Sequence, residues 1–181
     1  MSISKDSKFL SYTLRHSPSA IDLTLDKNGW VPIEELLSAC ARHGRKLTLE
    51  QLMRIVTDND KLRFVISQDG LRIRASHGHS VAVDLALPES VPPEILFHGT
   101  AKRTLAAILT EGIRPGKRIY VHLSPDEETA VEVGKRHGPP VVLRVRAGEM
   151  QRDGFRFLIS GSGIWLTQWV PAEYLVAGRT K

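Results

Sequence analysis

The segment VDLALPESVPPEI, residues 83–95, constrains the fold most, because it carries three prolines and no regular alternation of apolar and polar residues. Proline interrupts helices and central strands, so such a segment is typical of a connection between domains. We therefore expect this chain of 181 residues to form two lobes, at 1–84 and 94–181, joined by a linker at 85–93.

The lobe before the linker opens with a helical pattern. In SKFLSYTLRH the apolar residues recur at helical spacing, and Pro18 predicts that this helix stops shortly before it. Asn28-Gly29 in LTLDKNGWVPIEELL is typical of a hairpin-type turn. Pro32 suits the first position of a second helix, which we expect over about 32–43.

A third helix and a hairpin complete the first lobe. TLEQLMRIVTDND begins with Thr48 and Gln51 in the spacing of a capping box and continues with a helical apolar face. RFVIS and LRIRAS are strand-like and are separated by Gln68-Asp69-Gly70, which favours a tight turn. Three helices followed by a hairpin predict a winged-helix-like lobe.

The second lobe is richer in strands. ILFHGT, RIYVHLS, PPVVLRVRA, RFLIS and GIWLTQW are strand-like, and AKRTLAAILTEG predicts a helix stopped by Gly112. We expect Ser124 to cap a further helix that runs to about Arg136, and a short helix in VPAEYLVAG. The whole chain is therefore expected to be an α+β protein.

Composition narrows the class of protein. No apolar run approaches the roughly 20 residues that a membrane span needs, and MSISKDSKFL lacks the apolar core of a signal peptide, so we expect a cytoplasmic protein without membrane contact. Cys40 is the single cysteine, which excludes a disulfide within the chain and a cysteine-clustered zinc site. The net charge of +5 hints at a polyanionic partner such as nucleic acid.

Three stretches place polar groups at strand ends or turns: HGT at 98–100, VHLS at 121–124 and GSGIWLT at 161–167. Glycine at such places lets a ligand approach the backbone closely. Taken singly, each histidine could instead be a hydrogen-bonded structural residue, and the GSG glycines could form a turn or bulge. GSG lacks the third glycine and the setting of a dinucleotide-binding fingerprint.

Cationic residues form a second set. Arginine offers a rigid fork that matches phosphate oxygens, so several arginines predict phosphate recognition if the fold brings them together. Singly, each could be a solvated surface residue, and Arg15 with His16 could simply complement a helix dipole. The set comprises Arg15, His16, Lys61, Arg63, Arg72, Arg74, Lys117 and Arg118. The seven histidines, His77 and His79 among them, have no zinc-like spacing, and we expect no metal site.

Several sequence blocks, taken in their order along the chain, resemble a known protein family. They cover nearly the whole chain, from about Lys8 to Leu175. FLSYTLRHSP, DLTLDKNGWVPIEELL, NDKLRF, IRASHGHS, LFHGT, RIYVHLSPDEETA, PVVLRVRA and GIWLTQWVP together resemble the RNA 2'-phosphotransferase family. The resemblance implies a winged-helix-like lobe followed by a lobe of the ADP-ribosyltransferase fold. It also implies an enzyme that removes an internal 2'-phosphate from RNA, as left by one type of tRNA splicing, and consumes NAD as co-substrate.

The same resemblance assigns residues to roles. The catalytic set carries over to Arg15, His16, Arg63 and Arg118. The residues expected to bind NAD are His98, Gly99, Thr100, His122, Leu123, Ser124 and Ile164. The residues expected to bind RNA are Arg74, His77, His79 and Ser80. The partner is then a tRNA-like RNA, and we expect a monomer.

Two positions depart from the family pattern. His77 stands where the family usually has glutamine, and Ser162 stands where it commonly has asparagine. Both departures concern contacts to RNA and NAD rather than the four catalytic positions. Two other functions stay open: transfer of ADP-ribose to a terminal phosphate of nucleic acid, and a winged-helix regulator without enzymatic activity. A regulator without enzymatic activity would give no reason for the HGT, VHLS and GIWLT blocks to occur together.

Overall fold

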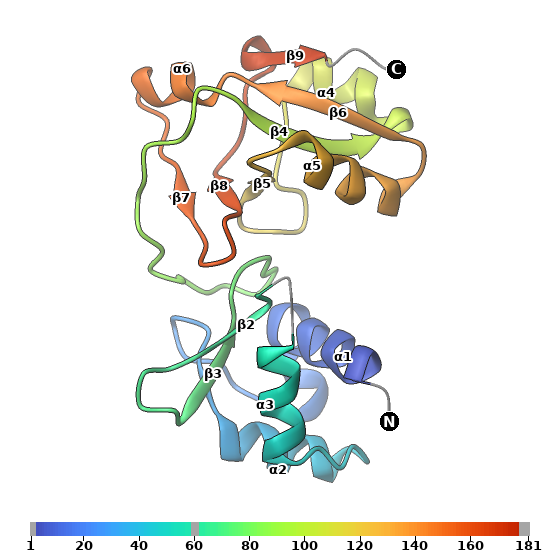
Figure 1. Cartoon of the computed structure of the whole chain (residues 1–181), viewed down its shortest axis with the longest axis vertical. Coiled ribbons are helices and arrows are strands. Elements are labelled where there is room, and N and C mark those ends of the chain that lie inside the picture. Colours follow the sequence, from blue (N-terminus) through green and yellow to red (C-terminus); the bar gives the residue numbers. More distant parts are fainter. Residues whose placement is uncertain (1–2, 59–61, 178–181) are drawn as a thin grey trace. The chain divides into compact units, whose positions relative to one another are not determined.

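A computed structural model describes residues 3–58 and 62–177, so Lys61 of the cationic set lies outside the described residues (Figure 1). The chain divides into two compact units, Met1–Ala86 and Leu87–Lys181, which we call unit 1 and unit 2. Both units combine helices with small antiparallel sheets, which confirms the expected α+β class. Within the described ranges, no helix is both long and apolar enough to cross a membrane.

The described residues of unit 1 form three α-helices and a three-stranded antiparallel sheet with the strand order β1-β3-β2. Its elements are α1 (Ile3–His16), η1 (Pro18–Ile21), β1 (Val31–Pro32), α2 (Ile33–Arg42), α3 (Leu49–Thr57), β2 (Phe64–Ile66) and β3 (Arg72–Ala75). Leu10 and Leu14 of α1 are fully buried in the core of this unit. The apolar face that the sequence predicted for α1 is therefore the face that packs.

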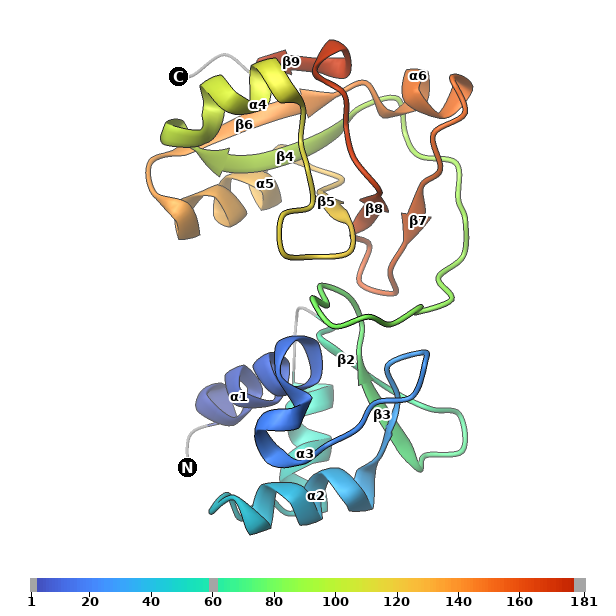
Figure 2. The same ribbon diagram turned by 180° about the vertical axis from the view of Figure 1, so that it is seen from behind.

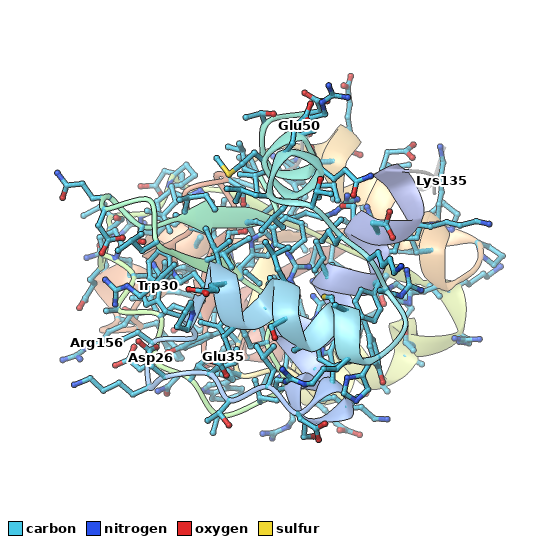
Figure 3. The ribbon with its side chains drawn as sticks, turned by 90° about the horizontal axis from the view of Figure 1, so that it is seen from below. Asp26, Trp30, Glu35, Glu50, Lys135 and Arg156 are labelled. Carbon is cyan, nitrogen blue, oxygen red and sulfur yellow. The ribbon has the colours of Figure 1, made fainter. Side chains whose placement is uncertain are left out.

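Local signals in unit 1 behave largely as expected. Thr48 and Gln51 form the predicted capping box at the start of α3. The turn after residue 26 forms too, because Asp26 accepts hydrogen bonds from the backbone of Asn28 and Trp30; Asp26 and Trp30 are labelled in Figure 3. No strand of the described chain precedes this turn, so it does not join two hairpin strands as expected, and Val31 pairs with Ile73 of β3 instead.

Unit 2 contains two three-stranded antiparallel sheets, ordered β4-β6-β9 and β5-β8-β7. Its strands are β4 (Leu96–Ala101), β5 (Val121–Leu123), β6 (Pro140–Val145), β7 (Leu158–Ile159), β8 (Trp165–Thr167) and β9 (Leu175–Ala177). Its helical elements are η2 (Lys102–Thr104), α4 (Leu105–Glu111), α5 (Glu127–Gly134), η3 (Lys135–His137), α6 (Ala147–Arg152) and η4 (Ala172–Tyr174). A bridge between Phe97 and Ser124 links the two sheets.

Two expectations for unit 2 are corrected. Ser124 does not cap α5, because its backbone pairs with Phe97 through bonds of 2.7 and 2.9 Å and so continues the strand. Asp126 caps the helix instead, accepting a bond from the Thr129 backbone. The helix expected in VPAEYLVAG is a single 3₁₀ turn, η4, and the short helix α6 was not foreseen.

Close packing of α5 against β4 fixes the identity of Gly99 (Figures 1 and 2). A β-carbon at Gly99 would lie 1.7 Å from the carbonyl oxygen of Ala130 and 2.9 Å from the backbone nitrogen of Gly134. All of these neighbours are backbone atoms, which cannot move without displacing the helix. Helix packing is therefore a sufficient reason for glycine at this position, and the expected contact of Gly99 with NAD stays a prediction.

Candidate functional site

Three segments of unit 1 meet at the end of α1. Arg15 lies in the last turn of this helix, and its Nη2 donates to the carbonyl oxygen of Arg63 at 3.3 Å. The backbone N–H of Ser80 donates to the Arg15 carbonyl at 2.9 Å, which satisfies one of the carbonyls left over at the helix end. The fold thus brings together residues 15, 63 and 80, which are far apart in the sequence.

His16 is exposed beside this junction. Its Nδ1 lies 3.0 Å from the hydroxyl oxygen of Ser80, and its ring lies 5.7 Å from the ring of Tyr12. Both contacts limit how the imidazole can turn. We call Arg15, His16, Arg63 and Ser80 the unit 1 cluster.

Arg63 enters this cluster from the start of the β2–β3 hairpin. Its Nη1 donates to the buried Ser7 hydroxyl at 3.2 Å, and its carbonyl accepts from the backbone of Ser76 at 2.9 Å. A guanidinium held in this way keeps further N–H donors, which suit phosphate oxygens. Sequence reasoning missed Ser7, although a serine on the same helical face as Leu10 and Leu14 is an unusual polar residue there.

Arg74 plays a structural part in the same unit. Its Nη1 donates to the carbonyls of Asn28 at 3.2 Å and Leu85 at 2.9 Å, and its guanidinium lies 4.5 Å from the centre of the Trp30 ring. Burial lowers the pKa of Arg74, but an arginine remains charged in a protein. Arg74 therefore ties the turn before β1 to the segment after β3, and its expected contact with RNA stays a prediction.

His79 precedes Ser80 of the unit 1 cluster in the chain and is only 2% exposed. Neither ring nitrogen has a hydrogen-bond partner among the described residues. Burial first, and then the charges of Arg15, His16 and Arg74, lower the pKa of His79 from 6.5 to about 4. His79 is therefore neutral at pH 7, and such a buried ring is badly placed to contact RNA directly. His77 is half-buried, and its Nδ1 lies 3.0 Å from the Ser76 hydroxyl.

Lowering the pH from 6.5 to about 4 should destabilise unit 1 through His79. In this range His79 is protonated in the unfolded chain but stays neutral in the folded chain. The free energy of unfolding that His79 contributes above pH 6.5 is therefore lost as the pH falls. The loss attributable to this residue is roughly 3 kcal/mol. Urea unfolding across this range should show a steeper loss for the natural protein than for His79→Leu. Equal slopes in both proteins would contradict the assignment.

In unit 2, two histidines meet where β4 and β5 lie side by side. The Nδ1–H of His98 donates to the carbonyl of His122 at 3.2 Å, and the Nδ1–H of His122 donates to the carbonyl of Tyr120 at 3.0 Å. A carbonyl can only accept, so both rings carry their proton on Nδ1. Burial lowers the pKa of His98, which keeps this ring neutral at pH 7. We call His98 and His122 the histidine pair.

The other residues expected to bind NAD lie on or next to β4, β5 and β8. Thr100, Leu123 and Ser124 are buried, and the Thr100 hydroxyl lies 2.8 Å from that of Thr104. Ile164 follows the turn between β7 and β8, and its N–H donates to the Ser160 hydroxyl at 3.1 Å. Extending the β5–β8 pairing by one residue places Ile164 opposite Ser124. Sheet pairing thus gathers HGT, VHLS and GIWLT into one region of unit 2.

Arg118 stands in the loop before β5 and is exposed along part of its length. Partial burial, followed by the charge of Arg136, lowers the pKa of its guanidinium. The charge of Arg118 in turn contributes to the lowered pKa of His98, so the two residues lie within electrostatic range of each other. Among the residues that the structure describes, no three His, Cys, Asp or Glu side chains group in a way that could hold a metal ion.

These features define a protein with an arginine–histidine cluster suited to phosphate in one unit and the histidine pair, of which His98 is neutral at pH 7, in the other. Comparison with known proteins identifies the class as transferases of RNA 2'-phosphate. The family described as "RNA 2'-phosphotransferase, Tpt1 / KptA family" matches residues 2–169. The chain therefore belongs to the RNA 2'-phosphotransferase family, as the sequence blocks indicated.

Bacterial relatives are similar over almost their whole length. The chain is 55% identical over 171 residues to a probable RNA 2'-phosphotransferase of Streptomyces coelicolor, which covers 94% of this chain and 93% of the relative. It is 53% identical over 170 residues to a protein of the same name from Pectobacterium carotovorum, covering 93% and 91%. A further one, from Flavobacterium johnsoniae, is 49% identical over 169 residues, covering 93% of each protein.

Proposed function

We propose that this protein removes an internal 2'-phosphate from RNA and consumes NAD as co-substrate. The observation that carries the proposal is the meeting of Arg15, His16 and Arg63 in one cluster, because the family resemblance assigns these three residues, with Arg118, to catalysis. Family membership supports RNA 2'-phosphate as the substrate. The dependence on NAD rests on the resemblance of the HGT, VHLS and GIWLT blocks.

The first step needs little acid–base chemistry. A phosphate monoester has a second pKa near 6, so at neutral pH the RNA 2'-phosphate is largely a dianion and is already a nucleophile. Arg15 and Arg63 hold this phosphate by charge-assisted hydrogen bonds and so orient one oxygen for attack. That oxygen bonds to the ribose carbon of NAD, and the carbon–nitrogen bond breaks with its electron pair leaving on nicotinamide.

The second step does need proton transfer. A ribose hydroxyl of the attached ADP-ribose bonds to phosphorus, and the bond between phosphorus and the RNA 2'-oxygen breaks. Nε2 of His16, the ring nitrogen opposite the Ser80 contact, is the atom that we assign to moving the proton from the hydroxyl to the departing 2'-oxygen. Arg63 and Arg118 stabilise the charge on the phosphoryl oxygens. The products are RNA with a free 2'-hydroxyl and ADP-ribose cyclic phosphate.

His98 suits the ribose hydroxyls and amide of NAD better than its diphosphate. Its neutral imidazole, with the proton on Nδ1, presents Nε2 as a hydrogen-bond acceptor, and hydroxyl and amide groups can donate to it. We further propose that unit 1 is a winged-helix-like lobe and unit 2 a lobe of the ADP-ribosyltransferase fold. The three helices and three-stranded sheet of unit 1 support the first assignment. A tRNA-like substrate, a cytoplasmic location and a monomeric state complete the proposal.

The test is a reaction with defined components. The purified protein is incubated with NAD, a chelator and a short RNA that bears one internal 2'-phosphate. We expect the RNA to lose its phosphate, with release of nicotinamide and ADP-ribose cyclic phosphate in equal amounts. No phosphate should be lost when NAD is omitted.

A second RNA with a terminal 5'-phosphate separates the alternatives. If this RNA acquires ADP-ribose while the internal 2'-phosphate is untouched, the protein is a terminal ADP-ribosyltransferase. If neither RNA changes and NAD is not consumed, the proposed reaction is wrong, and binding of the RNA and of DNA should then be measured.

A further inference from the structure

Two basic turns of unit 2 lie at the same end of the β4–β6 ladder. η2 follows β4 and η3 precedes β6, and the N–H of Lys102 donates to the carbonyl of Pro139 at 3.0 Å. Ala101 pairs with Pro140 at the last position of the ladder. Figures 1 and 2 show the ends of β4 and α5 beside each other in opposite views, which agrees with these backbone contacts.

This surface carries cations without acidic partners. The residues of η2 and η3 are exposed. Lys135 pairs with Glu132 at 2.6 Å, and elsewhere in unit 2 Arg146 and Arg152 also pair with glutamates. In the described part of the chain, no ion pair neutralises the remaining side chains of the two turns. We call Lys102, Arg103 and Arg136 the cationic patch, and His137 follows Arg136 in η3.

The cationic patch adjoins residues of the proposed active site in unit 2. His98 lies on β4 and pairs with Leu143, three positions before the last pair of the ladder, Ala101 with Pro140, where the two turns meet. At about 3.3 Å per strand residue, His98 lies roughly 10 Å along the strand from the patch. The charge of Arg136 also contributes to the lowered pKa of the Arg118 guanidinium, which agrees with this placement. A polyanion bound along the patch could therefore continue to Arg118.

We propose that the cationic patch binds the phosphodiester backbone of RNA next to the nucleotide that carries the 2'-phosphate. This inference rests on the proposed function and names a docking surface for its substrate. RNA carries one negative charge per nucleotide, so a single strand can neutralise several separated cations, with release of counterions. The diphosphate of NAD is a single compact anion and cannot span two turns in the same way. Arginine and lysine are the side chains that commonly contact nucleic-acid phosphates.

The experiment compares two double variants with the same loss of charge. Arg103→Ala/Arg136→Ala alters the patch, and Arg144→Ala/Arg156→Ala removes two exposed arginines elsewhere in unit 2. Equilibrium binding is measured without NAD, for an RNA of about 12 nucleotides with one internal 2'-phosphate and for a trinucleotide with the same group. Thermal unfolding verifies that both variants are folded.

The patch variant should bind the longer RNA about tenfold more weakly at low salt. Its slope of log affinity against log salt should fall by about 1.4, which corresponds to two lost phosphate contacts on a single strand. Binding of the trinucleotide should change less than about twofold, since it is too short to reach from the 2'-phosphate across the patch. Arg103→Lys/Arg136→Lys should keep most of the salt slope, because lysine retains the charge. The control variant should behave like the natural protein.

Two results would overturn the assignment. An unchanged affinity and salt slope for the longer RNA would mean that the patch is only a solvated surface. In a separate turnover assay, a KM for NAD that the patch variant raises equally with both RNAs would assign the patch to the NAD diphosphate instead. Because binding is measured without turnover, a natural protein that binds RNA through the patch but removes no phosphate would refute the proposed function and leave the docking surface standing.

Discussion

Replacing Arg118 by alanine is expected to lower kcat/KM for removal of the 2'-phosphate by a factor of about 10² to 10³. This is the usual cost of deleting one preorganised donor that stabilises charge in a transition state. The guanidinium is partly buried and within electrostatic range of Arg136. In the alanine variant, solvent therefore cannot take over the role of the lost guanidinium. Steady-state kinetics with the internally phosphorylated RNA measures the loss.

Two controls make the Arg118 prediction specific. Arg118→Lys keeps the charge but loses the planar fork, and we expect an intermediate rate. Arg156→Ala removes an exposed arginine of the same unit and should change the rate less than about twofold, since surface substitutions seldom have larger effects. An Arg118→Ala enzyme with near-normal turnover would remove Arg118 from the catalytic set.

The shared role proposed for Arg63 and Arg118 can be tested with a double variant. If Arg63 and Arg118 act on one phosphate, the double alanine variant should lose less activity than the product of the two single losses. Strictly multiplicative losses would indicate that the two arginines act independently.

Replacing Gly99 by alanine is expected to destabilise unit 2 by about 3 kcal/mol or more, which is the upper range for overpacking a core. The added methyl would sit 1.7 Å from the Ala130 carbonyl oxygen, inside the contact distance of any pair of atoms. Relief requires α5 to move away from β4, which loses the buried contacts between them. Thermal unfolding should show Tm lower by roughly 10 °C.

The matched control for Gly99 is Gly161. A β-carbon at Gly161 meets no atom within 4 Å, so Gly161→Ala should leave Tm within about 2 °C of the natural value. If Gly99→Ala kept the natural Tm and lost only affinity for NAD, close approach of a ligand rather than helix packing would explain this glycine.

Elements governed by neighbouring residues were predictable from the sequence. The capping box of α3, the end of α1 before Pro18 and the end of α4 at Gly112 each depend on contacts within a few residues. Expectations failed where long-range pairing competed with a local signal. Ser124 has the residue type of a helix cap, but pairing with Phe97 keeps its backbone extended and leaves the cap to Asp126.

The candidate site likewise has residues that the sequence predicted and contacts that it could not predict. Motif order along the chain identified the family and marked Arg15, His16 and Arg63, which the structure brings together. The partners of these residues could not be foreseen, because the Ser7 hydroxyl and the Ser80 hydroxyl reach them from distant segments. Arg74 and His79 carry residue types suited to RNA, yet one ties two loops together and the other is buried.

The sequence by itself therefore determined the local elements, the family and the residues from which a phosphate site can be built, since these depend on residue type and spacing. Tertiary structure alone decided which donors are already engaged and which ring is neutral. It also requires residue 99 to be glycine, and it determines which cations gather at the end of the β4–β6 ladder. The physical reason is that burial, hydrogen bonding and electrostatic coupling depend on distances between residues remote in the chain, and only the packed fold sets those distances.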